Sequence, residues 1–254
     1  MINDKTLPCI LLLGGAGSRF SNINEPPKQL IKINKRTLLE NLIIHLKKNG
    51  IKNFVLPLGY KKTFFYDYFK IQKKLGKFTF NLVLSKNKIS LKKKDINIYL
   101  FDAGNKSSKL SRINQSLKLF NSESFFVSYG DGLADINIKN ILKIYKKYNK
   151  PVISSTKINS QYGHLEIYKR NKKKKFIEKP LMEMPINIGY YLFNKKIFLE
   201  NFSNKYELEG GFLKSLIKNN KLITYLHNGY FFNIDKKIDL VKIKKEKKKI
   251  IRKL

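Results

Sequence analysis

The sequence predicts an α/β fold, with a mostly parallel sheet flanked by helices and a C-terminal portion that is richer in strands. Three observations support this prediction: short apolar runs alternate with segments of helical periodicity up to about residue 160, glycines follow two of those runs, and strand patterns predominate afterwards. With 254 residues, of which 42% are hydrophobic, the chain can bury a substantial core. We expect one domain, 1–254, with parts at about 1–160 and 161–240 and a basic helix or tail at 241–254.

The first part alternates between strands and helices. Residues 7–13 form a largely apolar run that ends in two glycines, a pattern typical of a buried parallel strand. Residues 36–49 carry leucine and isoleucine at helical spacing, and Gly50 follows where a C′ glycine ends many helices. We predict further strands at 54–58, 78–84, 96–101, 125–129 and 151–156, and helices at 61–73, 107–120 and 137–148.

Strand patterns predominate after residue 160. Residues 162–168 and 176–178 flank a Lys, Arg and Asn run at 169–175, which predicts a hairpin tip. We also predict strands at 186–193, 222–226 and 230–234, with a helix at 208–219. Residues 236–254 form a Lys-rich helical pattern, for which we favour a solvated cap helix or a frayed tail over a membrane-surface helix.

The net charge is +35, from 53 Lys and Arg against 18 Asp and Glu, yet we do not expect a nucleic-acid partner. Only five of the basic residues are Arg, and the positive charge is spread along the chain. A nucleic-acid-binding protein more often gathers its charge on one element and uses Arg for bidentate contacts. The abundance of Lys, Ile and Asn fits translation from an AT-rich genome, and a positive surface would still attract small anionic substrates.

The single cysteine, Cys9, excludes a disulfide framework and a multi-cysteine zinc site. The apolar run 9–13 is too short to span a membrane, and no signal-type cleavage site follows it. We therefore expect a soluble, reduced, cytoplasmic protein with no membrane span, in which Cys9 is a small buried residue.

A glycine-rich loop follows the first predicted strand. Residues 11–20 read Leu-Leu-Leu-Gly-Gly-Ala-Gly-Ser-Arg-Phe, so backbone N–H groups could surround phosphate oxygens while Arg19 adds a positive fork. Phe20 stands where the dinucleotide-binding pattern needs a third glycine, and the P-loop pattern is absent. A simple tight turn is the alternative. The sequence Glu-Pro-Pro-Lys at 25–28 then places Lys28 just beyond the loop.

The strand, the Gly-Gly-x-Gly-Ser-Arg loop and the Pro-Lys pair together resemble the signature of sugar-nucleotide pyrophosphorylases, which are nucleotidyltransferases. Four later segments resemble the glucose-1-phosphate cytidylyltransferases in particular: 129–135, 162–163 followed by 176–180, 186–191 and 227–235. These matches run in order from about residue 8 to 240. The resemblance implies a Rossmann-like, glycosyltransferase-A-type fold whose C-terminal portion binds the sugar phosphate.

The resemblance also implies a set of site residues. Asp131 and Asp235 would hold Mg²⁺. Charge in the transition state would be stabilised by the catalytic residues Arg19, Lys28 and Lys179. The nucleotide would be bound by Leu12, Leu13, Gly14, Gly15, Ala16, Gly17, Ser18, Arg19, Lys28, Lys109 and Gly130. The sugar phosphate would be bound by Gly163, Glu178, Lys179 and Asn187.

The implied reaction transfers a nucleotidyl group from a nucleoside triphosphate to a sugar 1-phosphate. The predicted substrates are CTP and glucose 1-phosphate, which would give CDP-glucose, a nucleotide-sugar for polysaccharide biosynthesis, and pyrophosphate. One alternative is a different base or sugar, as in mannose-1-phosphate guanylyltransferase. Others are a catalytically lapsed binding protein and, on charge alone, a nucleic-acid-binding protein. The sequence leaves the oligomeric state open, a homo-oligomer included.

The sequence departs from the family pattern at several positions. Residues 106–109 read Lys-Ser-Ser-Lys where the family has Thr-Gly-Gly-Arg, and the stretch from Arg19 to Lys28 is one residue short. Ile188 replaces a glycine, and Lys236 replaces a threonine. Read without the resemblance, Asp131 could equally cap a turn and Asp235 could cap the last helix. These departures leave the base and the sugar open.

Overall fold

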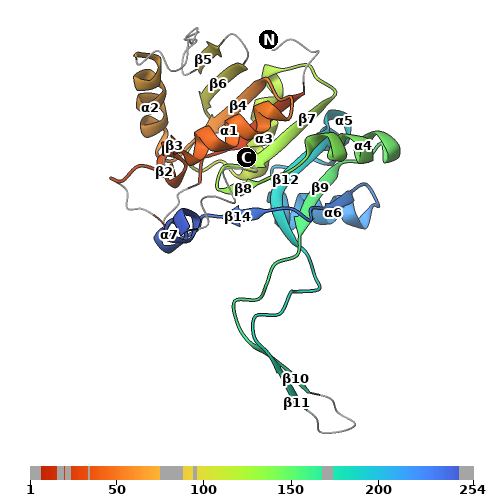
Figure 1. The fold of residues 1–254 in the computed structure, drawn as a ribbon. Coiled ribbons are helices and arrows are strands. Elements are labelled where there is room, and N and C mark those ends of the chain that lie inside the picture. The colour runs from red at the N-terminus through yellow and green to blue at the C-terminus, as the bar shows by residue number, and fades with distance from the viewer. Residues whose placement is uncertain are drawn as a thin grey trace.

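An eight-stranded sheet forms the centre of the fold (Figure 1). The computed structural model describes residues 7–15, 20, 24–33, 35–74, 88–93, 96–167 and 174–245. The strand order is β13-β9-β12-β7-β1-β4-β6-β5. Their bounds are β1 Pro8–Leu12, β4 Asn53–Leu58, β5 Lys88–Lys93, β6 Ile96–Asp102, β7 Ser124–Tyr129, β9 Val152–Thr156, β12 Ile186–Asn194 and β13 Ile223–Leu226.

The middle of the sheet is parallel. Strand β1 pairs in parallel with both β4 and β7, and β4 pairs in parallel with β6. Strand β12 is antiparallel to both of its neighbours, and β5 closes one edge as an antiparallel strand. The mostly parallel sheet flanked by helices confirms the α/β fold predicted from the sequence.

Helices cover both faces of the sheet, because the buried side chains of each strand alternate between two hydrophobic clusters. Cys9 and Leu11 belong to one cluster, whereas Ile10 belongs to the other. The first cluster takes side chains from α1 Leu38–Lys48, α2 Lys62–Lys74, α4 Ile138–Tyr148 and α7 Lys237–Lys245. The second takes side chains from α3 Lys109–Ser116, η2 Leu117–Leu119, α5 Lys195–Asn201, η3 Leu208–Phe212 and α6 Leu213–Lys218.

Local signals set the two ends of α1. The Thr37 hydroxyl accepts a hydrogen bond from the Glu40 backbone N–H at 3.1 Å, and the Glu40 carboxylate accepts one from the Thr37 backbone N–H at 2.6 Å. This capping box satisfies two N–H groups that would otherwise have no partner. The helix ends with Asn49 as its C-cap, and Gly50 adopts the predicted C′ position with a φ of +96°.

Three two-stranded ribbons complete the described fold. One joins β2 Lys32–Ile33 to β3 Arg36–Thr37, and another joins β8 Gly132–Ala134 to β14 Phe231–Asn233. The third is the predicted hairpin, which joins β10 His164–Ile167 to β11 Lys174–Ile177 and stands away from the rest of the chain (Figure 1). Several large apolar side chains of this arm are exposed, among them Tyr162 at 76% and Phe176 at 66%.

The structure adds elements that the sequence patterns did not predict, namely β5, α5 and the short strands β2, β3 and β8. The predicted helix 208–219 begins as a π-helical turn, η3, after the short α5. The predicted strand 78–84 and the end of the last helix, 246–254, lie outside the described residues. None of the helices that the structure describes combines the length and the apolar character needed to cross a bilayer.

Candidate active site

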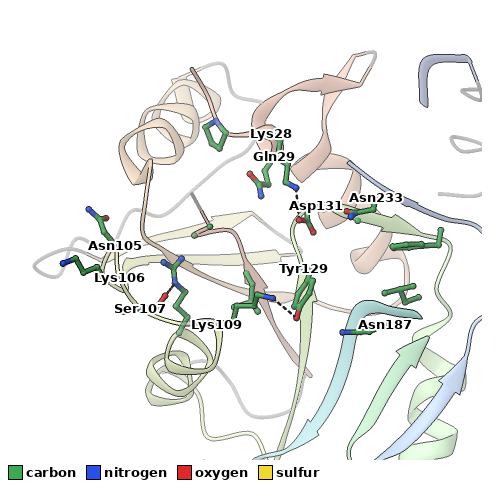
Figure 2. Close-up of a pocket in the computed structure, with 18 residues that line it drawn as sticks. Lys28, Gln29, Asn105, Lys106, Ser107, Lys109, Tyr129, Asp131, Asn187 and Asn233 are labelled. Carbon is green, nitrogen blue, oxygen red and sulfur yellow. Dashed lines mark hydrogen bonds and ion pairs between the residues drawn. The ribbon is translucent and has the colours of Figure 1, made fainter. Parts of the chain in front are cut away.

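A cavity of about 550 Å³ opens at the carboxyl ends of β1 and β7 (Figure 2). Leu12, Gly14 and Gly15 line it from the end of β1, and Tyr129 and Asp131 line it from the end of β7. These two strands are hydrogen-bonded neighbours in the sheet. The carboxyl edge of a parallel sheet is where doubly wound folds bind their ligands, so the cavity is the candidate active site.

Lys28 joins the two predicted metal-binding carboxylates. Its Nζ lies 2.9 Å from Asp131 Oδ2 and 3.3 Å from Asp235 Oδ1, and it donates a hydrogen bond to the Ile234 carbonyl at 2.7 Å. The Lys28 side chain is only 11% exposed, whereas Asp131 and Asp235 are 31% and 49% exposed. Figure 2 shows the Lys28 side chain reaching down to Asp131 from the short η1 turn Lys28–Leu30.

The β8–β14 ribbon explains why the two aspartates meet. Its antiparallel register pairs Gly132 with Asn233, and the Ile234 backbone N–H donates to the Asp131 carbonyl at 3.0 Å. Asp131 directly precedes one strand and Asp235 closely follows the other, so both lie at the same end of the ribbon. The structure therefore brings together two residues that are 104 positions apart in the sequence.

The side chain of Asp235 contacts two residues that line the cavity, and it does not cap α7. Its Oδ2 accepts a hydrogen bond from Asn233 at 3.0 Å, and its Oδ1 faces Lys28. The carboxylate that accepts the N–H groups at the start of α7 is Asp239, which bonds the backbone nitrogens of Asp235 and Lys236 at 3.0 and 2.8 Å. Asp235 is thus not needed as the cap of α7, and its carboxylate faces Lys28 and Asn233 instead.

The two carboxylates fit a hard divalent cation. Together with Lys28 they carry a net charge of −2 + 1 = −1, which favours a further positive charge. Mg²⁺ usually takes one or two carboxylates from the protein and completes its shell with water and phosphate oxygens. Within the described ranges no cluster holds three or more His, Cys, Asp or Glu in metal-binding positions.

The predicted nucleotide-binding residues divide into three groups. Leu12, Gly14 and Gly15 line the cavity, as do Lys28 and Lys109. Leu13 and Gly130 are buried behind the wall and do not line it. Ala16, Gly17, Ser18 and Arg19 lie outside the described residues.

Arg112 of α3 also lines the cavity, and the sequence analysis missed it. The residue is 4% exposed, and its guanidinium donates to the Ser107 carbonyl through Nε at 3.0 Å and to the Gly104 carbonyl through Nη2 at 3.2 Å. Nη1 has no hydrogen-bond partner among the described residues. The sequence offered one signal for Arg112, which is that it is one of only five arginines in a chain rich in lysine.

Arg112 explains why residue 14 is glycine. A Cβ atom on Gly14 would lie 1.0 Å from Arg112 Nη1, so only a residue without a side chain leaves room for the guanidinium. Burial lowers the pKa of Arg112 from its ordinary value, while the nearby Asp102 carboxylate raises it. The buried guanidinium thus ties the loop before α3 to the start of the glycine-rich loop.

Asn187 and Ile188 line the cavity from the start of β12. Asn187 Oδ1 accepts from the Gly189 backbone N–H at 2.9 Å, and Gly189 has a φ of +77°, which favours glycine. The pairing of β12 with β9 shifts register between Asn187 and Tyr191, so Asn187 lies at a local irregularity of the strand. Ile188 stands where the family has its first glycine. Its side chain is 3% exposed and packs into the first hydrophobic cluster.

The other predicted sugar-phosphate residues do not line the cavity. Gly163, Glu178 and Lys179 lie on the arm, next to the β10–β11 hairpin. Glu178 and Lys179 pair with each other at 3.3 Å and are about 60% exposed. Lys179 adopts a left-handed backbone conformation, with a φ of +48°. Their roles at the site remain predictions.

Comparison with known proteins agrees with the family predicted from the motifs. A family model described as nucleotidyl transferase matches residues 8–241. The chain is 28% identical to a probable glucose-1-phosphate cytidylyltransferase of Bacillus subtilis over 94% of this chain and 95% of the relative. It is also 28% identical to a D-glycero-α-D-manno-heptose 1-phosphate guanylyltransferase of Campylobacter jejuni over 90% of this chain and 94% of the relative.

The same fold occurs among solved structures. HddC from Yersinia pseudotuberculosis in complex with GMP-PN superposes with a TM-score of 0.66 and 21% sequence identity, covering 95% of this chain and 99% of that one. At this level of identity the likeness supports the fold alone. It agrees with the predicted sheet flanked by helices.

We predict that Gly14→Ala destabilises the protein because the new Cβ atom must displace the buried Arg112 guanidinium. Overpacking of this kind costs about 1–3 kcal/mol of unfolding free energy, which a denaturant titration can measure. Gly15→Ala is the matched control, because no described atom lies within 4 Å of a Cβ atom at that position. Equal unfolding free energies for the two variants would contradict the packing seen at Gly14.

Proposed function

The chain belongs to the nucleotidyl transferase family, and on this premise we propose that it transfers a cytidylyl group from CTP to glucose 1-phosphate. The products would be CDP-glucose and pyrophosphate. The observation that carries the proposal is that Lys28 and Asp131 line one cavity with Gly14 and Gly15, and that Lys28 also contacts Asp235 just outside the cavity wall. This arrangement places acidic ligands for a cation and a fixed ammonium next to a loop suited to phosphate.

The proposed reaction is an in-line displacement at the α-phosphorus of the nucleotide. A phosphate oxygen of the sugar 1-phosphate forms the new P–O bond, and the bond between the α-phosphorus and the bridging oxygen breaks, so that pyrophosphate leaves. Both reactants are anions, so positioning and positive charge matter more than a covalent nucleophile. Lys28 can stabilise charge that develops on the α-phosphate, and Lys109, which lines the same cavity, can help to hold the nucleotide.

Asp131 and Asp235 are the residues that would hold Mg²⁺, in keeping with the metal dependence general in this family. A bound magnesium ion would supply positive charge for the phosphates. The chain's own part is to fix the two carboxylates through the β8–β14 ribbon and to balance them with Lys28.

The choice of base is the finer part of the proposal. The cytidylyltransferase relative favours CTP, whereas the heptose 1-phosphate relative uses a guanylyl group. The residues that set this choice are expected on the loop before α3, where Asn105, Lys106 and Ser107 line the cavity. A guanylyltransferase acting on another sugar 1-phosphate is therefore the second candidate.

We predict that a panel of the four nucleoside triphosphates, each with glucose 1-phosphate and Mg²⁺, will release pyrophosphate fastest with CTP. Pyrophosphate detection measures the rate, and mass spectrometry identifies the nucleotide-sugar. Faster release with GTP and mannose or heptose 1-phosphate would replace the cytidylyl assignment by the second candidate. Binding of a nucleotide without any product would instead indicate a lapsed enzyme.

We predict that Lys28→Ala and Asp131→Asn each lower kcat by roughly a hundredfold or more, because Lys28→Ala removes a positive charge beside the phosphates and Asp131→Asn removes one of the two carboxylates that would hold the cation. Lys32→Ala provides the control, since Lys32 is an exposed lysine on the neighbouring ribbon strand β2. Circular dichroism would show whether the variants fold. Near-normal turnover in a folded Lys28 or Asp131 variant would contradict the assigned roles.

We predict that Lys179→Ala raises the KM for the sugar 1-phosphate while the KM for the nucleotide changes little, because the resemblance to the family assigns Lys179 to the sugar phosphate. Lys175→Ala, an exposed lysine on β11 of the same hairpin, is the control. Mixing Asp131→Asn and Lys179→Ala proteins tests whether the arm contributes to the cavity of its own chain or to that of another copy. Activity of the mixture above that of the two separate proteins would mean that the arm serves another copy, and no gain in activity would mean that it serves its own chain. Unchanged KM values in Lys179→Ala would remove Lys179 from the site.

A further inference from the structure

A chain of hydrogen bonds beneath the cavity ends on an acidic residue that the proposed reaction does not use. Glu209 lies in the π-helical turn η3, and its Oε1 accepts hydrogen bonds from Lys109 Nζ and from the Tyr129 hydroxyl. Lys109 and Tyr129 both line the cavity, whereas Glu209 does not. The turn η3 directly precedes α6, and single π-helical turns occur often at functional sites.

The same chain continues to Asn187. The Tyr191 hydroxyl donates to the Tyr129 hydroxyl at 3.0 Å, and Asn187 Nδ2 donates to the Tyr191 hydroxyl at 2.6 Å. Lys109 and Asn187 both line the cavity, on either side of Tyr129 (Figure 2). Four side chains, which include the predicted nucleotide ligand Lys109 and the predicted sugar-phosphate ligand Asn187, thus connect to one carboxylate.

The two ends of the chain fix the direction of its donors. Asn187 donates to Tyr191, Tyr191 donates to Tyr129, and Tyr129 donates to Glu209. A hydroxyl can donate or accept, so groups that can only donate or only accept set the direction. The ionised Glu209 carboxylate can only accept, and the Gly189 N–H can only donate, so it holds Asn187 Oδ1 and leaves the NH₂ group of Asn187 to face Tyr191.

The protonation states in the network agree with a chain of donors that ends on Glu209. Burial raises the pKa of Tyr129 well above its ordinary value and raises that of Tyr191 to about 12, so both hydroxyls keep their protons. Burial also raises the pKa of Glu209, but the hydrogen bonds from Lys109 and Tyr129 together lower it below its ordinary value. The Lys109 ammonium further lies 4.6 Å from the centroid of the Tyr129 ring, in position for a cation–π contact.

We propose that Glu209 is a positioning residue that couples the predicted nucleotide ligand Lys109 to the predicted sugar-phosphate ligand Asn187. It holds Lys109 against Tyr129 and, through Tyr129 and Tyr191, holds the Asn187 amide in position, while the Gly189 N–H sets the orientation of that amide. This inference rests on the proposed function for the identity of the two ligands. It adds a residue outside the cavity wall on which the binding of both ligands depends.

Glu209→Gln tests the proposal, because glutamine keeps the size of the side chain and removes its charge. We expect the Kd values for CTP and for glucose 1-phosphate, measured separately by equilibrium dialysis with Mg²⁺, each to rise by about tenfold, as when a charge-assisted hydrogen bond is lost. Glu207→Gln is the matched control, because Glu207 is an exposed acid two residues away. The control should leave both Kd values unchanged.

A double-mutant cycle separates positioning from a general loss of structure. In a Lys109→Ala background Glu209→Gln should no longer change the Kd for CTP, and in a Tyr191→Phe background it should no longer change the Kd for glucose 1-phosphate. Additive effects in both backgrounds, or a lower melting temperature with unchanged Kd values, would overturn the proposal. The proposed function is judged separately, since its failure would show as no pyrophosphate release by the unmutated protein.

Discussion

The Lys28 ammonium group is the point at which three distant parts of the chain meet. It contacts Asp131 after β7, Asp235 after β14 and the Ile234 carbonyl, and its side chain is almost fully buried by them. Without this group two carboxylates would face each other at one end of the β8–β14 ribbon with no positive charge between them. The geometry of the candidate site, and the position of η1 that carries Lys28, therefore depend on one interaction.

Much of this arrangement could be predicted from the sequence, because its signals are local or belong to a recognisable motif. The apolar run ending in two glycines predicted β1 and the loop after it, and helical spacing with Gly50 predicted α1 and its end. The two aspartates came from segments that resemble a known family, so their convergence followed from the resemblance. Nothing in the spacing of residues 131 and 235 alone would have paired them.

The remainder depends on tertiary contacts that leave no pattern in the sequence. Arg112 and Glu209 are charged residues on short helices, where the usual expectation is a solvent-exposed side chain. Only the packing of α3 against the start of the glycine-rich loop shows that Arg112 is buried, and only the π-helical turn brings Glu209 to Tyr129. The hairpin was predicted from its turn, but the sequence held no information on how far it stands from the cavity.

The charges of the cavity show why a strongly basic chain can still be selective. Lys28 is balanced by Asp131 and Asp235, and Lys109 is balanced by Glu209, so these ammonium groups are held in fixed positions. Lys106 and Arg112 line the same cavity and form no ion pair with any described residue. The net charge of +35 can draw any anion toward the surface, since such steering depends on the total field. Recognition then falls to the few cations whose geometry the fold has fixed, and a rigid set of donors favours an anion of matching shape over the many that the surface attracts.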